Sequence, residues 1–151
     1  MKRKQFKSIY SVLYKKFFHD KDNKYACFYC GDPADAKDHV PALCRVPDYR
    51  RLNLEKEEYF LVPSCTECNV LLSDSLQDSI LDRVIIAHGL LEEKYKKLLK
   101  GKKWNKQMIE DAELDGNLRL YIEGHTRVRS QIEARIDYWK GYNSILSREN
   151  K

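Results

Sequence analysis

Residues 25–40 read YACFYCGDPADAKDHV, and residues 60–70 read FLVPSCTECNV. Each stretch holds two cysteines that are separated by two residues. A C-x-x-C pair forms a tight knuckle that directs both sulfur atoms at one metal ion, and two knuckles complete a tetrahedron of thiolates. The spacing therefore predicts one structural Zn²⁺ ion, with four ligands: Cys27, Cys30, Cys65 and Cys68.

A single C-x-x-C pair also occurs in redox proteins, but two pairs without a nearby βαβ pattern favour zinc. A disulfide framework is not expected, because such frameworks are rare inside cells. Gly31 follows the first pair, where the chain often needs a positive φ. The fifth cysteine, Cys44, is expected to be a small buried side chain.

The composition is that of a soluble globular chain. Of the 151 residues, 42% are hydrophobic and 34% are charged. No apolar run approaches the roughly 20 residues that span a bilayer. The basic N-terminus is not followed by the apolar core of a signal peptide. A cytoplasmic protein that does not bind membranes is expected.

Positive charge is concentrated in two places. The net charge is only +5, but residues 1–19 and 94–106 contain several lysines and no acidic residue. Such blocks either bind a polyanion or form solvated helix faces. For a nucleic-acid partner, the expected contacts are Lys2, Arg3, Lys4, Lys37, Lys102 and Lys103.

The periodicity predicts a mainly α protein with a small α+β element. Apolar residues recur at helical spacing over 4–18, 76–99 and 117–146, and a short helix is expected within 104–114. All four prolines lie within 25–69, where helical periodicity is absent and strands are predicted at 34–40 and 59–62.

Three segments follow from these patterns. They are an N-terminal basic helix over 1–24, a zinc-bound core over 25–75, and a helical extension over 76–151 whose long helices are expected to pair as an antiparallel hairpin.

Three polar residues accompany the cysteines. Asp38 and His39 lie between the knuckles, and Asn69 directly follows the second one. Carboxylate and amide oxygens are ligands for a hard divalent cation, and an imidazole with an ordinary pKa of ~6.5 takes a proton from water at neutral pH. Neighbours in a strand point to opposite faces, so a twist or bulge is needed if Asp38 and His39 are to act on one phosphate.

The ordered set of cysteines, Asp38-His39-Val40-Pro41 and Asn69 resembles the HNH endonucleases, a branch of the ββα-metal nucleases. The resemblance spans about residues 25–75. It implies a two-stranded hairpin followed by a helix that begins near residues 65–69. It also implies that His39 is the general base, that Asp38 and Asn69 bind a catalytic Mg²⁺ or Mn²⁺ ion, and that the zinc is structural.

The sequence departs from the family at two positions. Phe60 stands where many members have an asparagine that braces the histidine loop, and Leu72 stands where many have a lysine. The fold class expected is therefore a zinc-bound ββα-metal HNH core flanked by an N-terminal helix and a C-terminal helical hairpin.

The function expected is metal-dependent hydrolysis of phosphodiester bonds in DNA, with RNA left open as a substrate. The source expected is a bacterium or a phage, and a homodimer through the C-terminal helices is also left open. Two rival interpretations are a zinc-stabilised module that binds nucleic acid without cutting it, and an interaction protein whose helical hairpin docks a partner.

Overall fold

The computed structural model describes residues 3–17, 25–51, 59–73 and 75–149. It is mainly helical with one small sheet, as the sequence predicted. The chain forms two compact units, Met1–Gly89 and Leu90–Lys151, so this division falls later than the expected one after residue 75. The helices of the first unit are α1 (Arg3–Tyr10), α2 (Val46–Arg51), α3 (Thr66–Leu71) and most of α4 (Ile80–Lys94). Two short 3₁₀ turns cover Ser11–Leu13 and Leu43–Arg45.

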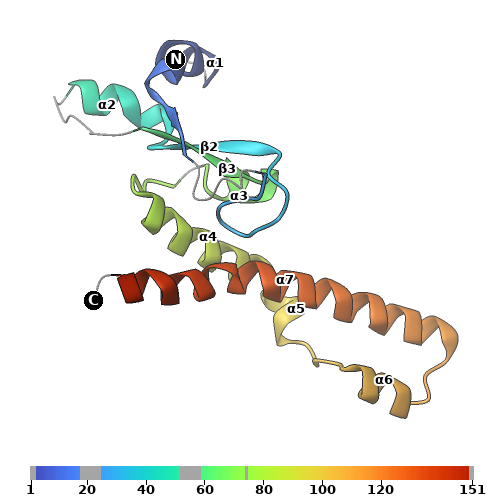
Figure 1. The fold of residues 1–151 in the computed structure, drawn as a ribbon. Coiled ribbons are helices and arrows are strands. Elements are labelled where there is room, and N and C mark those ends of the chain that lie inside the picture. The colour runs from blue at the N-terminus through green and yellow to red at the C-terminus, as the bar shows by residue number, and fades with distance from the viewer. Residues whose placement is uncertain (1–2, 18–24, 52–58, 74, 150–151) are drawn as a thin grey trace. The chain divides into compact units, whose positions relative to one another are not determined.

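The sheet has three strands in the order β1 (Lys15–Lys16), β3 (Phe60–Ser64) and β2 (Ala36–Val40). Strands β2 and β3 run antiparallel and lie side by side in Figure 1. They confirm the two predicted strands. Each residue of β2 pairs with one residue of β3, from Ala36 with Ser64 to Val40 with Phe60. The register is therefore regular over the whole of β2, with no bulge.

The regular register fixes the direction of each side chain in β2. Asp38 and Val40 are buried, whereas Lys37 is exposed and His39 is partly exposed. This alternation follows from the two-residue period of a strand. Asp38 and His39 consequently face opposite sides of the sheet.

The predicted helix over 4–18 ends early. Helix α1 stops at Tyr10, and Lys15–Lys16 instead pairs in parallel with Phe60–Leu61 of β3. Tyr14 turns inward, where it packs with Leu43 and Val46. The chain that was predicted as one helix is therefore divided into a helix, a 3₁₀ turn and a short edge strand.

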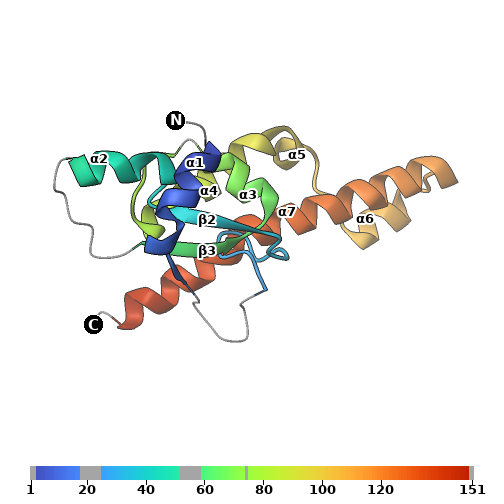
Figure 2. The same cartoon turned by 90° about the horizontal axis from the view of Figure 1, so that it is seen from above.

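Helix α3 follows β3 directly, and it lies against β2 in Figure 2. Cys65 is the N-cap residue, and its sulfur atom accepts a hydrogen bond from the backbone N–H of Cys68. The expected hairpin followed by a helix near residues 65–69 is thus present as β2, β3 and α3. Helix α2 lies between β2 and β3, in a segment where no helix was predicted.

The second unit contains the end of α4, then α5 (Lys96–Lys100), α6 (Lys106–Asp111) and α7 (Gly116–Glu149). The predicted helix over 76–99 is therefore two helices, separated at Tyr95. Helices α5 and α6 both pack on α7. Arg129 of α7 donates hydrogen bonds to the carbonyl oxygens of Leu99 and Gly101, at 2.7 Å and 2.5 Å.

A buried arginine joins several parts of the first unit. Arg83 of α4 is 1% exposed, and its guanidinium donates to both carboxylate oxygens of Asp38 at 2.8 Å. It also donates to the carbonyl oxygens of Leu72 and Gln77. Tyr29 donates its hydroxyl to Asp38 at 2.6 Å. This network ties α4, the first knuckle and the end of α3 to strand β2.

The positive charge of the Arg83 guanidinium is stabilised by its contacts with Asp38. Burial lowers the pKa of Arg83, but hydrogen bonding and attraction to Asp38 more than offset that effect, so the pKa is raised overall. Burial and the charge of Asp38 raise the pKa of Tyr29, which therefore stays protonated and donates its hydrogen bond.

Removal of Asp38 is expected to destabilise the first unit strongly. Asp38→Ala leaves the Arg83 guanidinium buried without its counter-ion, which typically costs about 3–5 kcal/mol. The measurement is the free energy of unfolding from urea denaturation. The control is Asp48→Ala, because the Asp48–Arg51 pair is solvent-exposed and such pairs contribute less than about 1 kcal/mol. Equal losses in the two variants would contradict the role given to the buried pair.

Candidate metal centre and adjoining cleft

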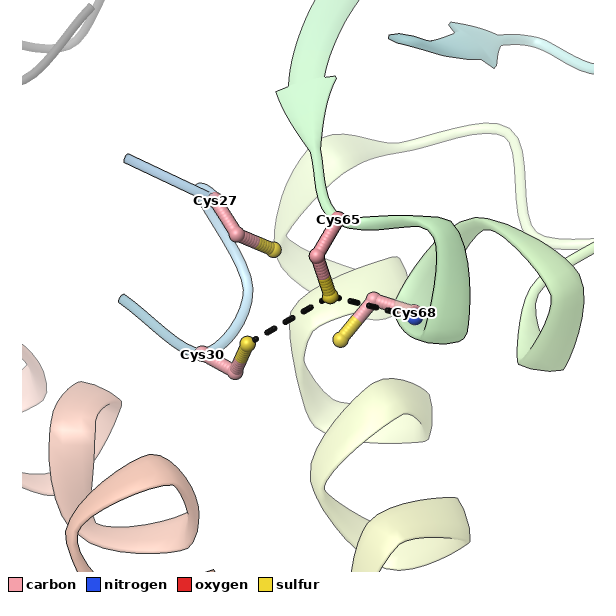
Figure 3. Close-up of side chains that lie close together, drawn as sticks. All are labelled: Cys27, Cys30, Cys65 and Cys68. Atoms are coloured by element: carbon pink, nitrogen blue, oxygen red, sulfur yellow. Dashed lines mark hydrogen bonds between the residues drawn. The ribbon is translucent and has the colours of Figure 1, made fainter. Parts of the chain in front are cut away.

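The four predicted zinc ligands converge on one point. Their sulfur atoms all lie within 4.8 Å of one another, and all four residues are buried. Figure 3 shows Cys27 and Cys30 on one loop, opposite Cys65 at the end of β3 and Cys68 on α3. The Cys30 and Cys65 sulfur atoms are 3.7 Å apart. A Zn–S bond of ~2.3 Å sets sulfur separations of about 3.8 Å in a tetrahedron, and the separation of the Cys30 and Cys65 sulfur atoms matches that value.

Local backbone bonds shape both knuckles. Gly31 has the expected positive φ, at 79°, and its N–H donates to the Cys27 carbonyl oxygen at 2.9 Å. The Cys68 N–H donates to the Cys65 sulfur at 3.4 Å, drawn as a dashed line in Figure 3. Four buried sulfur atoms that lie this close together form the donor set of a structural zinc site, which binds its cysteines as thiolates.

Next to this centre lies a cleft of about 730 Å³. It is formed by α1, by β2 with the residues before it, and by α3. His39 and Asn69 both line the cleft, together with one acidic residue, Asp35. Three lysines line it as well, namely Lys4, Lys7 and Lys37. The cleft therefore combines an imidazole, an amide, a carboxylate and three ammonium groups.

The structure brings some of the predicted catalytic residues together and separates one from them. His39 and Asn69 share the cleft, but Asp38 is on the other face of β2, bound to Arg83 and Tyr29. The bulge that would bring Asp38 and His39 to one phosphate is absent from β2. The assignment of Asp38 as a ligand of the catalytic metal does not match this geometry.

The predicted nucleic-acid contacts fall in different places. Lys4 and Lys37 line the cleft. Lys102 lies 4.1 Å from the centre of the Trp104 ring, and Lys103 forms an ion pair with Glu133 at 2.8 Å, both in the second unit. Arg3 is the first residue of α1. Lys2 lies outside the described residues.

The segment that bears His39 is braced by Tyr14. The Tyr14 ring meets the His39 ring edge-on, with centroids 4.9 Å apart, and its hydroxyl donates to the Pro41 carbonyl oxygen at 2.6 Å. Phe60, at the position of the family's bracing asparagine, instead packs against Phe17. Leu72, at the position of the family's lysine, is fully buried. Tyr14 thus contacts both His39 and Pro41, a role that the sequence did not indicate.

Asp35 and Arg83 were not among the residues predicted from the sequence. Arg83 had a usable signal, because it is three residues after Ile80 and four before Ala87, on the apolar face of α4. A charged residue at such a position needs a buried partner. Asp35 gave no such signal, since it lies in a short polar loop. Cys44 was expected to be buried but is exposed.

No family model matches the sequence, and neither a curated protein nor a solved structure is significantly similar to it. In the part of the chain that the structure describes, no helix has the length and apolar character needed to cross a membrane.

Loss of one zinc ligand is expected to unfold residues 25–75. Structural zinc contributes about 10 kcal/mol to small modules, and a segment of this length rarely has a core large enough to hold it folded without such a link. We expect one zinc ion per chain by elemental analysis, and loss of both the zinc and the cooperative thermal transition of the first unit in Cys65→Ser. The control is Cys44→Ser, which changes an exposed cysteine outside the cluster. Folded, zinc-free parent protein would contradict the assignment.

Proposed function

We propose that the protein is a metal-dependent endonuclease of the HNH type that hydrolyses phosphodiester bonds in DNA. One observation carries the proposal: His39 and Asn69 line a lysine-rich cleft beside a cluster of four cysteines. The resemblance to HNH nucleases supports the same conclusion, because the strand pair and helix that bear these residues occur in the order typical of that family.

The cleft contains groups suited to each part of the hydrolysis. The ammonium groups of Lys4, Lys7 and Lys37 attract a phosphodiester without reading its sequence. His39 accepts a proton from water as the water oxygen bonds to phosphorus, and the bond from phosphorus to the leaving sugar oxygen breaks. That oxygen then takes a proton from solvent. A divalent cation bound at Asn69 would supply positive charge for the phosphate oxygens.

The cysteine cluster would position this machinery without taking part in it. Cys65 caps the N-terminus of α3, and Cys68 lies in this helix directly before Asn69. Cys27 and Cys30 lie on either side of Phe28 and Tyr29. Phe28 donates its N–H to the Pro63 carbonyl oxygen of β3, and Tyr29 donates its hydroxyl to Asp38 of β2. A zinc ion bound at these four cysteines would therefore connect the helix that bears Asn69 to the strand that bears His39.

One observation favours the alternative of a zinc-stabilised module that binds nucleic acid without cutting it. The carboxylate of Asp38, which the family would use for its metal, is bound to Arg83 and Tyr29. A binding module would keep the cysteine cluster and the lysines of the cleft but would not hydrolyse DNA. The two functions differ in their requirement for His39.

DNA cleavage by this protein is expected to require an added divalent cation and His39. The purified, zinc-loaded chain is expected to nick supercoiled plasmid with added Mg²⁺ or Mn²⁺ and to stop when a chelator removes that cation. His39→Ala is expected to slow nicking by ~10²–10⁴-fold, the usual cost of losing a general base. The assay is the rate of conversion from supercoiled to open-circular plasmid on agarose gels.

His125→Ala is the matched control, because His125 lies on α7 in the second unit. It should nick at the parent rate. DNA binding by a parent protein that shows no nicking with any divalent cation would support the binding module instead. Equal nicking by His39→Ala and the parent would contradict the role of His39.

The lysines of the cleft are expected to contact the phosphates of bound DNA. DNA binding is expected to weaken with salt, because each neutralised phosphate releases about one counterion. Replacement of Lys4, Lys7 and Lys37 together by Gln should reduce the slope of log affinity against log salt by roughly 3. Fluorescence anisotropy with a labelled duplex measures the slope.

The control for this prediction replaces Lys97, Lys100 and Lys106 of the second unit by Gln, which removes the same charge from another part of the chain. An equal reduction in both triple variants would mean that net charge, and not the cleft, determines binding.

A further inference from the structure

The charges that line the cleft require a carboxylate if a divalent cation is to bind there. Three lysines repel a cation, and the amide of Asn69 carries no formal charge to balance them. Hard divalent cations are held in proteins mainly by carboxylate oxygens. A site made of Asn69 and water alone would therefore be weak.

Asp38 is poorly placed to supply that carboxylate. Both of its oxygens accept hydrogen bonds from Arg83, one also accepts from Tyr29, and the residue is 4% exposed. For Asp38 to reach the cleft, it would have to leave Arg83 buried without a counter-ion and turn to the other face of β2. Both changes are costly.

Asp35 already lies on the side of β2 that faces the cleft. Among the described residues that line the cleft, it is the only acid. It precedes β2, two residues before Lys37 and four before His39, and all three side chains line the cleft. Asp35 is exposed, so a hydrated cation can reach it.

A hydrogen bond ties Asp35 to the start of the helix that bears Asn69. Its Oδ1 atom accepts from the Thr66 N–H at 2.6 Å, at the first residue of α3. Asn69 is three residues further along the same helix, and its side chain lines the cleft together with Asp35. An ionised carboxylate has about four acceptor positions on two oxygens, so one N–H bond leaves capacity for a metal ion.

We propose that Asp35, and not Asp38, is the carboxylate ligand of the divalent cation in the His39 cleft, with Asn69 as its neutral partner. The proposal rests on the proposed function, because it identifies the metal ligands of the same site. In this arrangement Asp38 is a positioning residue. Its bonds to Arg83 and Tyr29 fix β2 so that His39 faces the cleft.

The test measures metal binding separately from DNA cleavage. Mn²⁺ is titrated into the zinc-loaded, full-length chain, and free Mn²⁺ is followed by its electron paramagnetic resonance signal. Asp35→Asn removes the charge but keeps an oxygen that can accept from Thr66, so folding and zinc content should not change. We expect Mn²⁺ affinity to fall roughly tenfold or more, since affinity depends on the number of charged ligands.

The control Asp48→Asn removes one charge from α2, outside the set of residues that line the cleft, and is expected to keep the parent affinity. Unchanged Mn²⁺ affinity in Asp35→Asn would overturn the proposal. It would also be overturned if folded Asp38→Asn protein lost Mn²⁺ binding while Asp35→Asn kept it.

Plasmid nicking distinguishes this proposal from the proposed function. A parent protein that nicks DNA, with an Asp35→Asn variant that nicks as fast and binds Mn²⁺ as tightly, would refute the role of Asp35 alone. A parent protein that binds Mn²⁺ through Asp35 but does not nick would refute the nuclease and leave the metal site standing.

Discussion

The antiparallel pairing of β2 with β3 is the constraint on which the rest of the first unit depends. Because each residue of β2 has one partner in β3, the side chains alternate without interruption. Asp38 therefore lies in the core and His39 lies in the cleft. The core side is completed by Arg83 and Tyr29, and the cleft side by α1 and α3.

The two faces of β2 thus have different tasks. On the buried face, a charged pair links α4, the first knuckle and the end of α3, and its net stability depends on the hydrogen bonds that satisfy both ions. On the open face, polar groups remain accessible to water and to a phosphate. The arrangement separates the residues that hold the strand from those suited to chemistry, although Asp38 and His39 are adjacent in the sequence.

Local patterns in the sequence predicted much of this structure. The four cysteines could be grouped because C-x-x-C spacing determines knuckle geometry within a few residues. Strands β2 and β3 also followed from local signals, whereas the start of α3 was implied by the resemblance to HNH endonucleases. The alternation of a strand already raised the question of how Asp38 and His39 could act together, and the regular register answers it.

The features that the sequence did not reveal depend on contacts between distant segments. The ion pair between Asp38 and Arg83 joins positions that no short motif connects. Tyr14 was predicted to lie in a helix because its apolar neighbours have helical spacing. In the structure, its hydroxyl donates a hydrogen bond to the Pro41 carbonyl oxygen, and the two residues that follow it pair with β3. Asp35 is close to α3 only because the β2–β3 hairpin brings their ends together.

The most direct test of this account is anomalous X-ray diffraction from crystals of the full-length protein grown with Zn²⁺ and soaked in Mn²⁺. The account predicts zinc among the four cysteines and manganese in the cleft, in contact with Asp35 and Asn69 and beside His39, while Arg83 remains bound to Asp38. Manganese bound to Asp38, with Arg83 displaced from it, would contradict the account.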